Sequence, residues 1–206
     1  MENVVGFVGY ECEDIAIYIA KILHALGKTV AVVDRTEQEL LCEIFDLRAD
    51  SEKTWKEGEY SGVLITNRGV NQKEYDFVFY LFGYRLNHPK LYECKKLIMV
   101  TDGVPAHASL LKMVENWECK RFLLIRNLVP MKHTEAYLAS LTGKEDEFRE
   151  IAFDEKDIRS RCSMGAYTGC EVKNLSAGMK RVLVFLVCNL NGEYGEKRVR
   201  EQIKKL

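Results

Sequence analysis

Short apolar runs alternate along the chain with longer segments of helical periodicity. Continuous apolar stretches of this length are typical of buried strands, and they occur at residues 3–8, 29–33, 62–66, 76–82, 96–101 and 121–125, with a shorter candidate at 150–153. Apolar positions three and four residues apart predict amphipathic helices, which we expect near residues 14–26, 37–47, 106–117, 133–141, 175–190 and 195–206.

This alternation predicts the fold class. Continuous apolar strands that alternate with helices are typical of a mostly parallel sheet covered on both faces. We therefore expect a three-layer α/β fold with a mostly parallel central sheet, formed by a single domain over residues 1–206. Ligands of such sheets sit at the carboxyl ends of the strands, and those ends fall near Gly9, Asp34, Gly83, Asp102 and Asn127.

The composition narrows the class of protein. Of 206 residues, 47% are hydrophobic, and 30 Lys and Arg are balanced by 31 Asp and Glu, so we expect no overall attraction to nucleic acid. The seven cysteines form no CxxC pair, which fits a reducing compartment. The N-terminus lacks a basic segment before its short apolar run, and we expect neither a signal peptide nor a membrane span. The cytoplasm is the expected location.

The strongest family signal lies in residues 4–38, VVGFVGYECEDIAIYIAKILHALGKTVAVVDRTEQ. This segment resembles the first βαβ unit of the ParA/MinD family of P-loop ATPases, which carries KGGVGKTT, a helix containing LA…L…G and a strand closing in DxDxQ. The helix and second-strand positions match without a gap. Segments that resemble later family elements follow in order at residues 75–83, 95–114, 121–130, 151–165 and 174–187.

The phosphate-binding loop departs from the family pattern. On the same frame, FVGYECED stands in place of KGGVGKTT, and Gly9 is the one loop glycine that remains. Cys12 takes the place of the lysine that grips the phosphates in the family, and Glu13 that of the hydroxyl that holds magnesium. Phe7 replaces the lysine that reaches the partner's nucleotide across the family's dimer. Leu81 replaces an acid at the end of a later strand.

These departures weaken any grip on a triphosphate. A P-loop works because glycines turn backbone N–H groups toward the phosphates and a lysine adds charge. Charge-assisted hydrogen bonds of about 1.5–3 kcal/mol each are lost with the lysine. The carboxylates of Glu11, Glu13 and Asp14 would each repel a phosphate by roughly 3 kcal/mol at ~5 Å. We therefore expect no ATPase activity, no bound ATP or magnesium, and no other metal site.

Three further positions have two interpretations each. Asp34 corresponds to the family's water-positioning aspartate, or it caps the helix expected after it. Cys12 is a reactive loop thiol or an inert small residue, and its acidic neighbours disfavour a thiolate. Asn127 falls near the position of the asparagine that contacts the base of the nucleotide in the family. The family has asparagine followed by arginine, whereas this chain has Arg126 followed by Asn127, which puts that role in doubt.

Aromatic residues near the strand ends indicate a protein interface. Phe7 and Tyr10, with Phe82 or Tyr84, could form an apolar surface where the family binds nucleotide and dimerises. Such aromatic side chains would make that interface constitutive. We therefore expect a homodimer.

The basic segment at the end of the sequence allows two interpretations. Residues 195–206, GEKRVREQIKKL, form an amphipathic helix that either is packed or solvated as a terminal helix or contacts the inner face of a membrane reversibly. Its thin apolar side, without an aromatic residue, and the charges of Glu196 and Glu201 disfavour the membrane contact.

Together these patterns favour a pseudo-ATPase, a scaffold or positioning protein that resembles the TadZ/CpaE-like proteins and binds protein partners of a localised assembly such as pilus or secretion machinery. The alternative is a nucleotide-dependent partitioning ATPase with an atypical loop. A third class, an enzyme that uses Glu11, Glu13, Asp34 or Asp102 as acid or base, lacks a convergent catalytic set.

Overall fold

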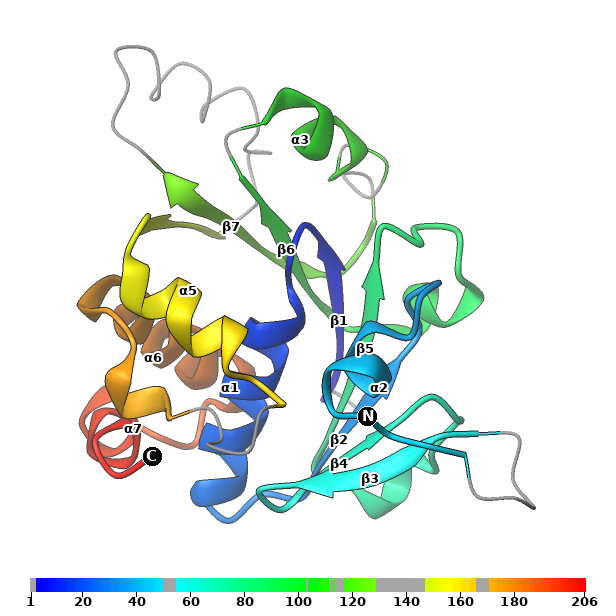
Figure 1. The fold of residues 1–206 in the computed structure, drawn as a ribbon, viewed down its shortest axis with the longest axis horizontal. Helices are drawn as coiled ribbons and strands as arrows, with labels where there is room; N and C mark the ends of the chain where they lie inside the picture. The colour runs from blue at the N-terminus through cyan, green and yellow to red at the C-terminus, as the bar shows by residue number, and fades with distance from the viewer. Residues whose placement is uncertain are drawn as a thin grey trace.

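In the computed structural model, which describes residues 3–49, 55–102, 104–111, 113, 117–128, 147–165 and 171–206, eight strands form one central sheet (Figure 1). The strands are β1 (Val4–Gly9), β2 (Val30–Asp34), β3 (Glu57–Tyr60), β4 (Val63–Thr66), β5 (Phe77–Gly83), β6 (Lys96–Thr101), β7 (Lys120–Leu128) and β8 (Glu147–Ala152). Their order is β3-β4-β2-β5-β1-β6-β7-β8, and every pair except β3–β4 is parallel. The expected mostly parallel α/β sheet is confirmed.

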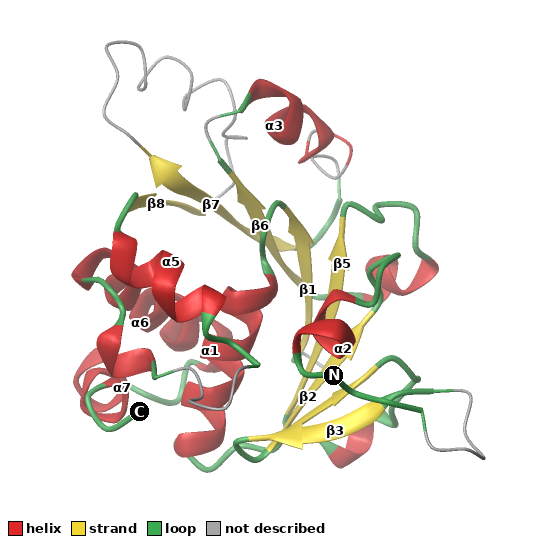
Figure 2. Cartoon of the chain, in the orientation of Figure 1, coloured by secondary structure: helices red, strands yellow, loops and turns green. Residues whose placement is uncertain are grey.

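Helical segments cover both faces of this sheet (Figure 2). The described α-helices are α1 (Glu13–Ala25), α2 (Leu40–Ile44), α3 (Pro105–Leu111), α5 (Glu155–Cys162), α6 (Ala177–Asn191) and α7 (Glu196–Ile203). Helices α1, α6 and α7 pack against one another and share one core cluster with the sheet. The short 3₁₀ segment Pro89–Glu93 contributes Leu91 to a second cluster, formed by the side chains that point to the other face.

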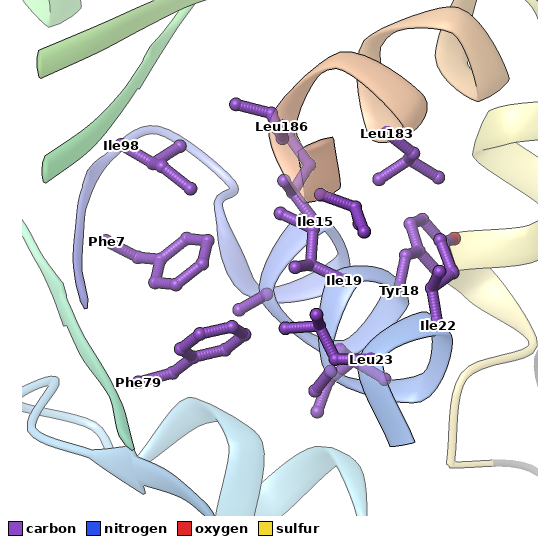
Figure 3. Close-up of a cluster of buried hydrophobic side chains, with 14 of the residues drawn as sticks. Phe7, Ile15, Tyr18, Ile19, Ile22, Leu23, Phe79, Ile98, Leu183 and Leu186 are labelled. Carbon is purple, nitrogen blue, oxygen red and sulfur yellow. The ribbon is translucent and has the colours of Figure 1, made fainter. Parts of the chain in front are cut away.

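The larger core cluster explains the burial of α1. Every residue of this helix from Asp14 to Leu23 is buried, because the sheet covers one side of the helix and α6 covers another. Figure 3 shows Ile15 and Ile19 between the strand side chains and Leu186 of α6. The helix is thus held on several sides, and its N-terminus is fixed at the end of β1.

Two aromatic residues expected at a surface lie in the core instead. Phe7 is 0% exposed, and its ring packs 5.1 Å from that of Phe79, on the side of β1 that faces α1 (Figure 3). Phe82 is also 0% exposed and stacks beside Tyr80 in the second cluster. The interface prediction is therefore wrong for Phe7 and Phe82, because β1 and β5 are central strands with both faces covered.

Several elements differ in extent from the expected ones. The helix expected over 37–47 contracts to α2, and the one expected over 106–117 ends at Leu111 in the described residues. Strand β3 was not expected, since its sequence EGEY is polar. Helix α5 occupies a stretch that resembled a family loop, and Asp154 caps it by accepting a 2.9 Å hydrogen bond from the Lys156 N–H. The helix expected over 133–141 lies outside the described residues.

The last helix packs on the domain. Val199 and Ile203 of α7 are buried and belong to the larger core cluster. Their burial accounts for the apolar side of the helix, as the packing interpretation requires, and leaves its basic residues at the surface. No helix in the described part of the chain has the length and apolar character that crossing a bilayer requires.

Candidate functional site at the carboxyl ends of the strands

The turn from β1 into α1 is pressed against the end of β6. Gly9 has φ 103°, and a Cβ at this position would lie 2.0 Å from the Val100 carbonyl oxygen. The N–H of Tyr10 donates a 2.8 Å hydrogen bond to that same oxygen. Glu11 follows in the left-handed region at φ 48°, and α1 begins at Glu13 with Cys12 as its N-cap. Only glycine fits the first position, because of both its φ and its contact.

Cys12 is an inert residue of this turn. The side chain is 0% exposed, and its Sγ lies 3.8 Å from the Gly9 carbonyl oxygen. Burial raises the pKa of the thiol well above its ordinary value, and the charges of Glu13 and Asp14 raise it further. A thiol that stays protonated is a poor nucleophile, so the burial of Cys12 supports the inert interpretation.

A buried ion pair joins the N-terminus of α1 to β7. The Arg126 Nη1 and Nη2 atoms lie 2.8 and 2.9 Å from the two carboxylate oxygens of Asp14, and both side chains are at most 1% exposed. Arg126 Nη1 also donates to the Glu11 carbonyl oxygen. This two-pronged arrangement is the strong geometry for an arginine and a carboxylate, and it fixes the turn to the opposite half of the sheet.

A second arginine reaches the same turn from α5. Arg161 forms an ion pair with the Glu11 carboxylate. The Tyr18 hydroxyl donates a 3.1 Å hydrogen bond to Ser160 Oγ, which ties α5 to α1 one turn further along. Cations from β7 and α5 therefore hold the β1–α1 turn from one side.

A cleft of about 310 Å³ opens on the other side of the turn. It lies between the loops that follow β1, β2 and β5, and it is lined by Gly9, Glu11, Glu13, Thr36, Glu37, Gln38, Leu40, Phe82, Gly83, Tyr84 and Arg85. Arg161 neutralises Glu11. The carboxylates of Glu13 and Glu37 and the guanidinium of Arg85 remain as the charges of the lining.

Glu13 is the most perturbed acid of the cleft. Burial raises its pKa from an ordinary 4.5 to about 7, its own backbone N–H opposes this rise, and the charge of Asp14 adds to it. A carboxyl group in this state changes charge near neutral pH.

The raised pKa of Glu13 gives a first prediction. Its protonated form stabilises the fold fully below pH 4.5, and this contribution is lost as the pH rises through about 7. Over this pH range the free energy of unfolding of the wild-type protein falls by roughly 3 kcal/mol. Glu13→Gln removes this fall, so thermal denaturation should show the variant gaining stability over wild type between pH 5 and pH 8. Glu37→Gln, at the exposed rim of the same cleft, is the control. A parallel pH profile for Glu13→Gln and wild type would contradict the assignment.

Comparisons with known proteins now identify the fold. No family model matches the chain, and no curated protein matches it in sequence. Two solved structures are similar over the whole chain. One is a protein assigned to plasmid partition from Borrelia burgdorferi B31, bound to AMPPNP, with a TM-score of 0.58, 11% identity and 100% of each chain covered. The fold is that of the ParA-type P-loop ATPases.

The second similar structure is the pNOB8 ParA protein bound to nonspecific DNA. It has a TM-score of 0.50 and 10% identity, and the match covers 100% of this chain and 99% of the other. At such identities the comparison concerns the fold, so the chemistry of the site must be read from the residues of this chain.

The residues present do not fit a triphosphate at the ParA-type position. The Ile15 N–H, in the first turn of α1, donates a 2.8 Å hydrogen bond to Asp14 Oδ1, and the Tyr10 N–H is bonded to Val100. Asp14 and Glu13 thus place carboxylates where a P-loop presents bare amides to phosphate. Cys12, which the sequence resemblance aligns with the family's lysine, is buried. The two cations that contact the turn, Arg126 and Arg161, are already paired.

Asp34 caps α2. Its Oδ2 accepts hydrogen bonds from the Leu41 and Cys42 N–H groups at 2.6 and 3.3 Å, and its Oδ1 accepts from both the hydroxyl and the N–H of Thr36. Burial raises the pKa of Asp34, although these hydrogen bonds oppose the rise. The capping interpretation is confirmed, with the helix beginning at Leu40 rather than at residue 37.

Tyr84, which lines the cleft, belongs to a small group of aromatic side chains with Tyr10 and His107. The ring of Tyr10 stacks on His107 with centroids 4.6 Å apart, and His107 Nδ1 lies 2.9 Å from Asp102 Oδ1. Tyr84 approaches the same imidazole at 6.0 Å and is 40% exposed. Of the four aromatic residues expected at an interface, Tyr10 is half-buried and Tyr84 is exposed, whereas Phe7 and Phe82 are buried.

Asn127 stands in a bulge of β7. It has φ 58°, and the register between β7 and β8 shifts between Ile125 and Leu128. Arg126, its neighbour, shares the face of Phe122 and Leu124 and therefore points toward α1. The reversed order of this pair thus puts an arginine at the turn, and the base-contacting role of Asn127 stays a prediction.

Proposed function

We propose that this chain is a non-catalytic relative of the ParA/MinD ATPases, a pseudo-ATPase that acts as a scaffold or positioning protein. The observation that carries the proposal is the buried pair of Arg126 with Asp14 at the N-terminus of α1. In a P-loop protein this helix end binds the negative charge of phosphate. Here the negative charge belongs to the chain itself, and an internal arginine neutralises it.

Electrostatics supports the absence of an ATP cycle. A phosphate at the turn would meet the carboxylates of Glu13 and Asp14, and each close pair of like charges costs roughly 3 kcal/mol. To recruit Arg126, the phosphate would have to leave Asp14 buried without a partner, which costs about 3–5 kcal/mol. Both effects oppose nucleotide binding, and we expect neither ATP nor magnesium as a cofactor.

The fold supports the proposed positioning role. One similar structure is a protein assigned to plasmid partition, and another is a ParA protein. We propose a homodimer that binds protein partners of a localised assembly, with pilus or secretion machinery as the example closest to the TadZ/CpaE-like proteins. The near balance of 30 basic and 31 acidic residues gives no reason to propose DNA as a partner.

Titration with ATP and magnesium tests the proposal. Isothermal calorimetry should give no binding heat, and the purified protein should release phosphate only at the background rate. A ParA-type ATPase with an intact loop, measured under the same conditions, is the positive control. Saturable binding together with magnesium-dependent turnover would establish the alternative, a partitioning ATPase with an atypical loop.

A further inference from the structure

The end of β2 places Arg35 beside the last residues of β5. The Arg35 N–H donates a 2.7 Å hydrogen bond to the Leu81 carbonyl oxygen, which extends the parallel pairing of Asp34 with Leu81 by one residue. Arg35 therefore lies opposite Phe82, on the side of the sheet where Val33 belongs to the second core cluster. This is the face of the sheet away from α1.

The guanidinium of Arg35 has donors that the described residues do not use. Its Nη1 donates to the Asn67 carbonyl oxygen, which fixes the group between the ends of β2 and β4. Its Nε is buried without a hydrogen-bond partner, and no described carboxylate forms an ion pair with it. A Cβ at Gly69 would meet only Nη2 among the described residues, at 3.9 Å, so the space beside that nitrogen is open. An unpartnered buried donor costs free energy, and a ligand with oxygen acceptors would supply the partner.

His88 brings a second donor to the same place. Its ring lies 5.3 Å from that of Phe82, measured between centroids. Nδ1 accepts a 3.1 Å hydrogen bond from the Lys90 N–H, so the proton of the neutral ring is on Nε2, which has no partner among the described residues. Burial lowers the pKa of His88, and the charges of Arg85, Arg35 and Lys90 lower it further, so the ring is a neutral donor at neutral pH.

Two guanidinium groups near His88 have no ion pair in the described part of the chain. One is Arg35, and the other is the exposed Arg85, whose carbonyl oxygen accepts a 3.3 Å hydrogen bond from the His88 N–H. Lys90 is already paired with Glu93 at 2.8 Å. Every charged group that shifts the pKa of His88 is a cation. This corner of the molecule therefore attracts an anion.

We propose that Arg35, Arg85 and His88 form a binding site for a phosphate dianion, either inorganic phosphate or the phosphate group of a small monoester. Two guanidinium groups match the charge of a dianion, and their planar donors suit its oxygens. The neutral imidazole adds a hydrogen bond from Nε2. None of these residues belongs to the β1–α1 turn, and Arg35 lies on the other face of the sheet from Asp14. The inference does not rest on the proposed function.

Isothermal calorimetry with inorganic phosphate tests the site. We expect saturable binding with a Kd of ~1 mM or tighter. Arg35→Gln and Arg85→Gln should each weaken it roughly 10-fold or more, because each removes charge-assisted hydrogen bonds. Arg68→Gln is the matched control, since Arg68 follows β4 at the same end of the sheet but already pairs with Glu57 at 2.9 Å. Heats that do not saturate, or equal affinity in all three variants, would overturn the inference.

A second variant keeps the test decisive if Arg35→Gln disturbs the end of β2. In His88→Asn the amide oxygen can still accept the Lys90 N–H before the 3₁₀ segment, but the Nε2 donor is gone, so phosphate should bind more weakly. NMR titration of the wild-type imidazole gives an independent readout. Phosphate should raise the pKa of His88, because an anion offsets the nearby cations, whereas chloride at equal ionic strength should not. Identical titrations in the two salts would contradict the site.

Two organic phosphates distinguish the sources of the anion. Glycerol 2-phosphate is a monoester, and dimethyl phosphate is a diester with a single charge. A monoester that binds as tightly as inorganic phosphate would assign the site to phosphorylated small molecules, and a monoester that binds much more weakly would assign it to the free ion. A diester that binds as tightly as either would refute a site for dianions.

Calorimetry with ATP and magnesium on Arg35→Gln separates this inference from the proposed function. Binding of ATP to the wild-type protein that is lost in Arg35→Gln would belong to the phosphate site and leave the pseudo-ATPase assignment standing. Magnesium-dependent binding and turnover that persist in Arg35→Gln would refute the proposed function alone.

Discussion

Replacing Arg126 by methionine should destabilise the fold by about 3–5 kcal/mol, because Asp14 would then be a buried carboxylate without a partner. Asp14 is 0% exposed, and both of its oxygens contact the Arg126 guanidinium. The same change also removes the donor to the Glu11 carbonyl oxygen. Urea denaturation at neutral pH measures the loss as a lower midpoint with an unchanged slope.

A paired substitution distinguishes the ion pair from simple packing. The double variant Arg126→Met with Asp14→Leu should recover most of the stability, because buried ion pairs are often replaced by apolar residues at little cost. Arg161→Met is the matched control. Arg161 is partly exposed where it pairs with Glu11, so its loss should cost less than about 1 kcal/mol. If Arg126→Met lowered the stability no more than Arg161→Met does, the buried guanidinium of Arg126 would not be what fixes the turn.

The sheet and its principal helices can be predicted from the sequence, because a strand that is buried on both faces of the sheet has a continuous apolar sequence. Runs such as those at 29–33 and 96–101 are continuous and apolar, and only central parallel strands require that pattern. Strand β3 escapes this reasoning. It lies at the edge of the sheet, has the polar sequence EGEY and pairs antiparallel with β4. Its residues carry no apolar strand pattern, and it is a strand because it pairs with β4.

The loop chemistry was partly accessible from the sequence. The absence of lysine, serine and threonine from residues 7–14, the buried Cys12 and the capping Asp34 all depend on residues close together in the chain. The partner of the Asp14 carboxylate could not be predicted from the sequence, because Asp14 and Arg126 are 112 positions apart. One signal was present: Arg126 continues the alternation of Phe122 and Leu124 on the α1 face, and an arginine at such a position requires a buried acid.

The aromatic residues near the strand ends show where the sequence pattern gave a wrong prediction of the interface. Phe7 and Phe82 precede the strand ends, and their position in central strands makes them core residues. Tyr10 and Tyr84 follow the strand ends by one residue each, and for that reason Tyr10 is half-buried and Tyr84 is exposed. A single residue at the end of a strand thus separates the core from the candidate interface.

The turn that carries Tyr10 depends on Gly9. Gly9→Ala should destabilise the protein by roughly 3 kcal/mol or more, since an alanine at φ 103° is strained and its Cβ would lie 2.0 Å from the Val100 carbonyl oxygen. Relief of that clash would move β1 away from the end of β6 and lengthen the 2.8 Å hydrogen bond from Tyr10 to Val100. Thermal and urea denaturation should both report the loss.

Gly27→Ala separates the two causes. Gly27 has φ 91°, but a Cβ there would meet nothing within 4 Å, so this variant should show only the backbone strain, about 1 kcal/mol. The excess loss in Gly9→Ala then measures the contact between the turn and β6. Equal losses in the two variants would mean that the turn can move away from β6 at little cost. In that case the contact of the turn with the end of β6 would not be what holds Tyr10 and Glu13 in place.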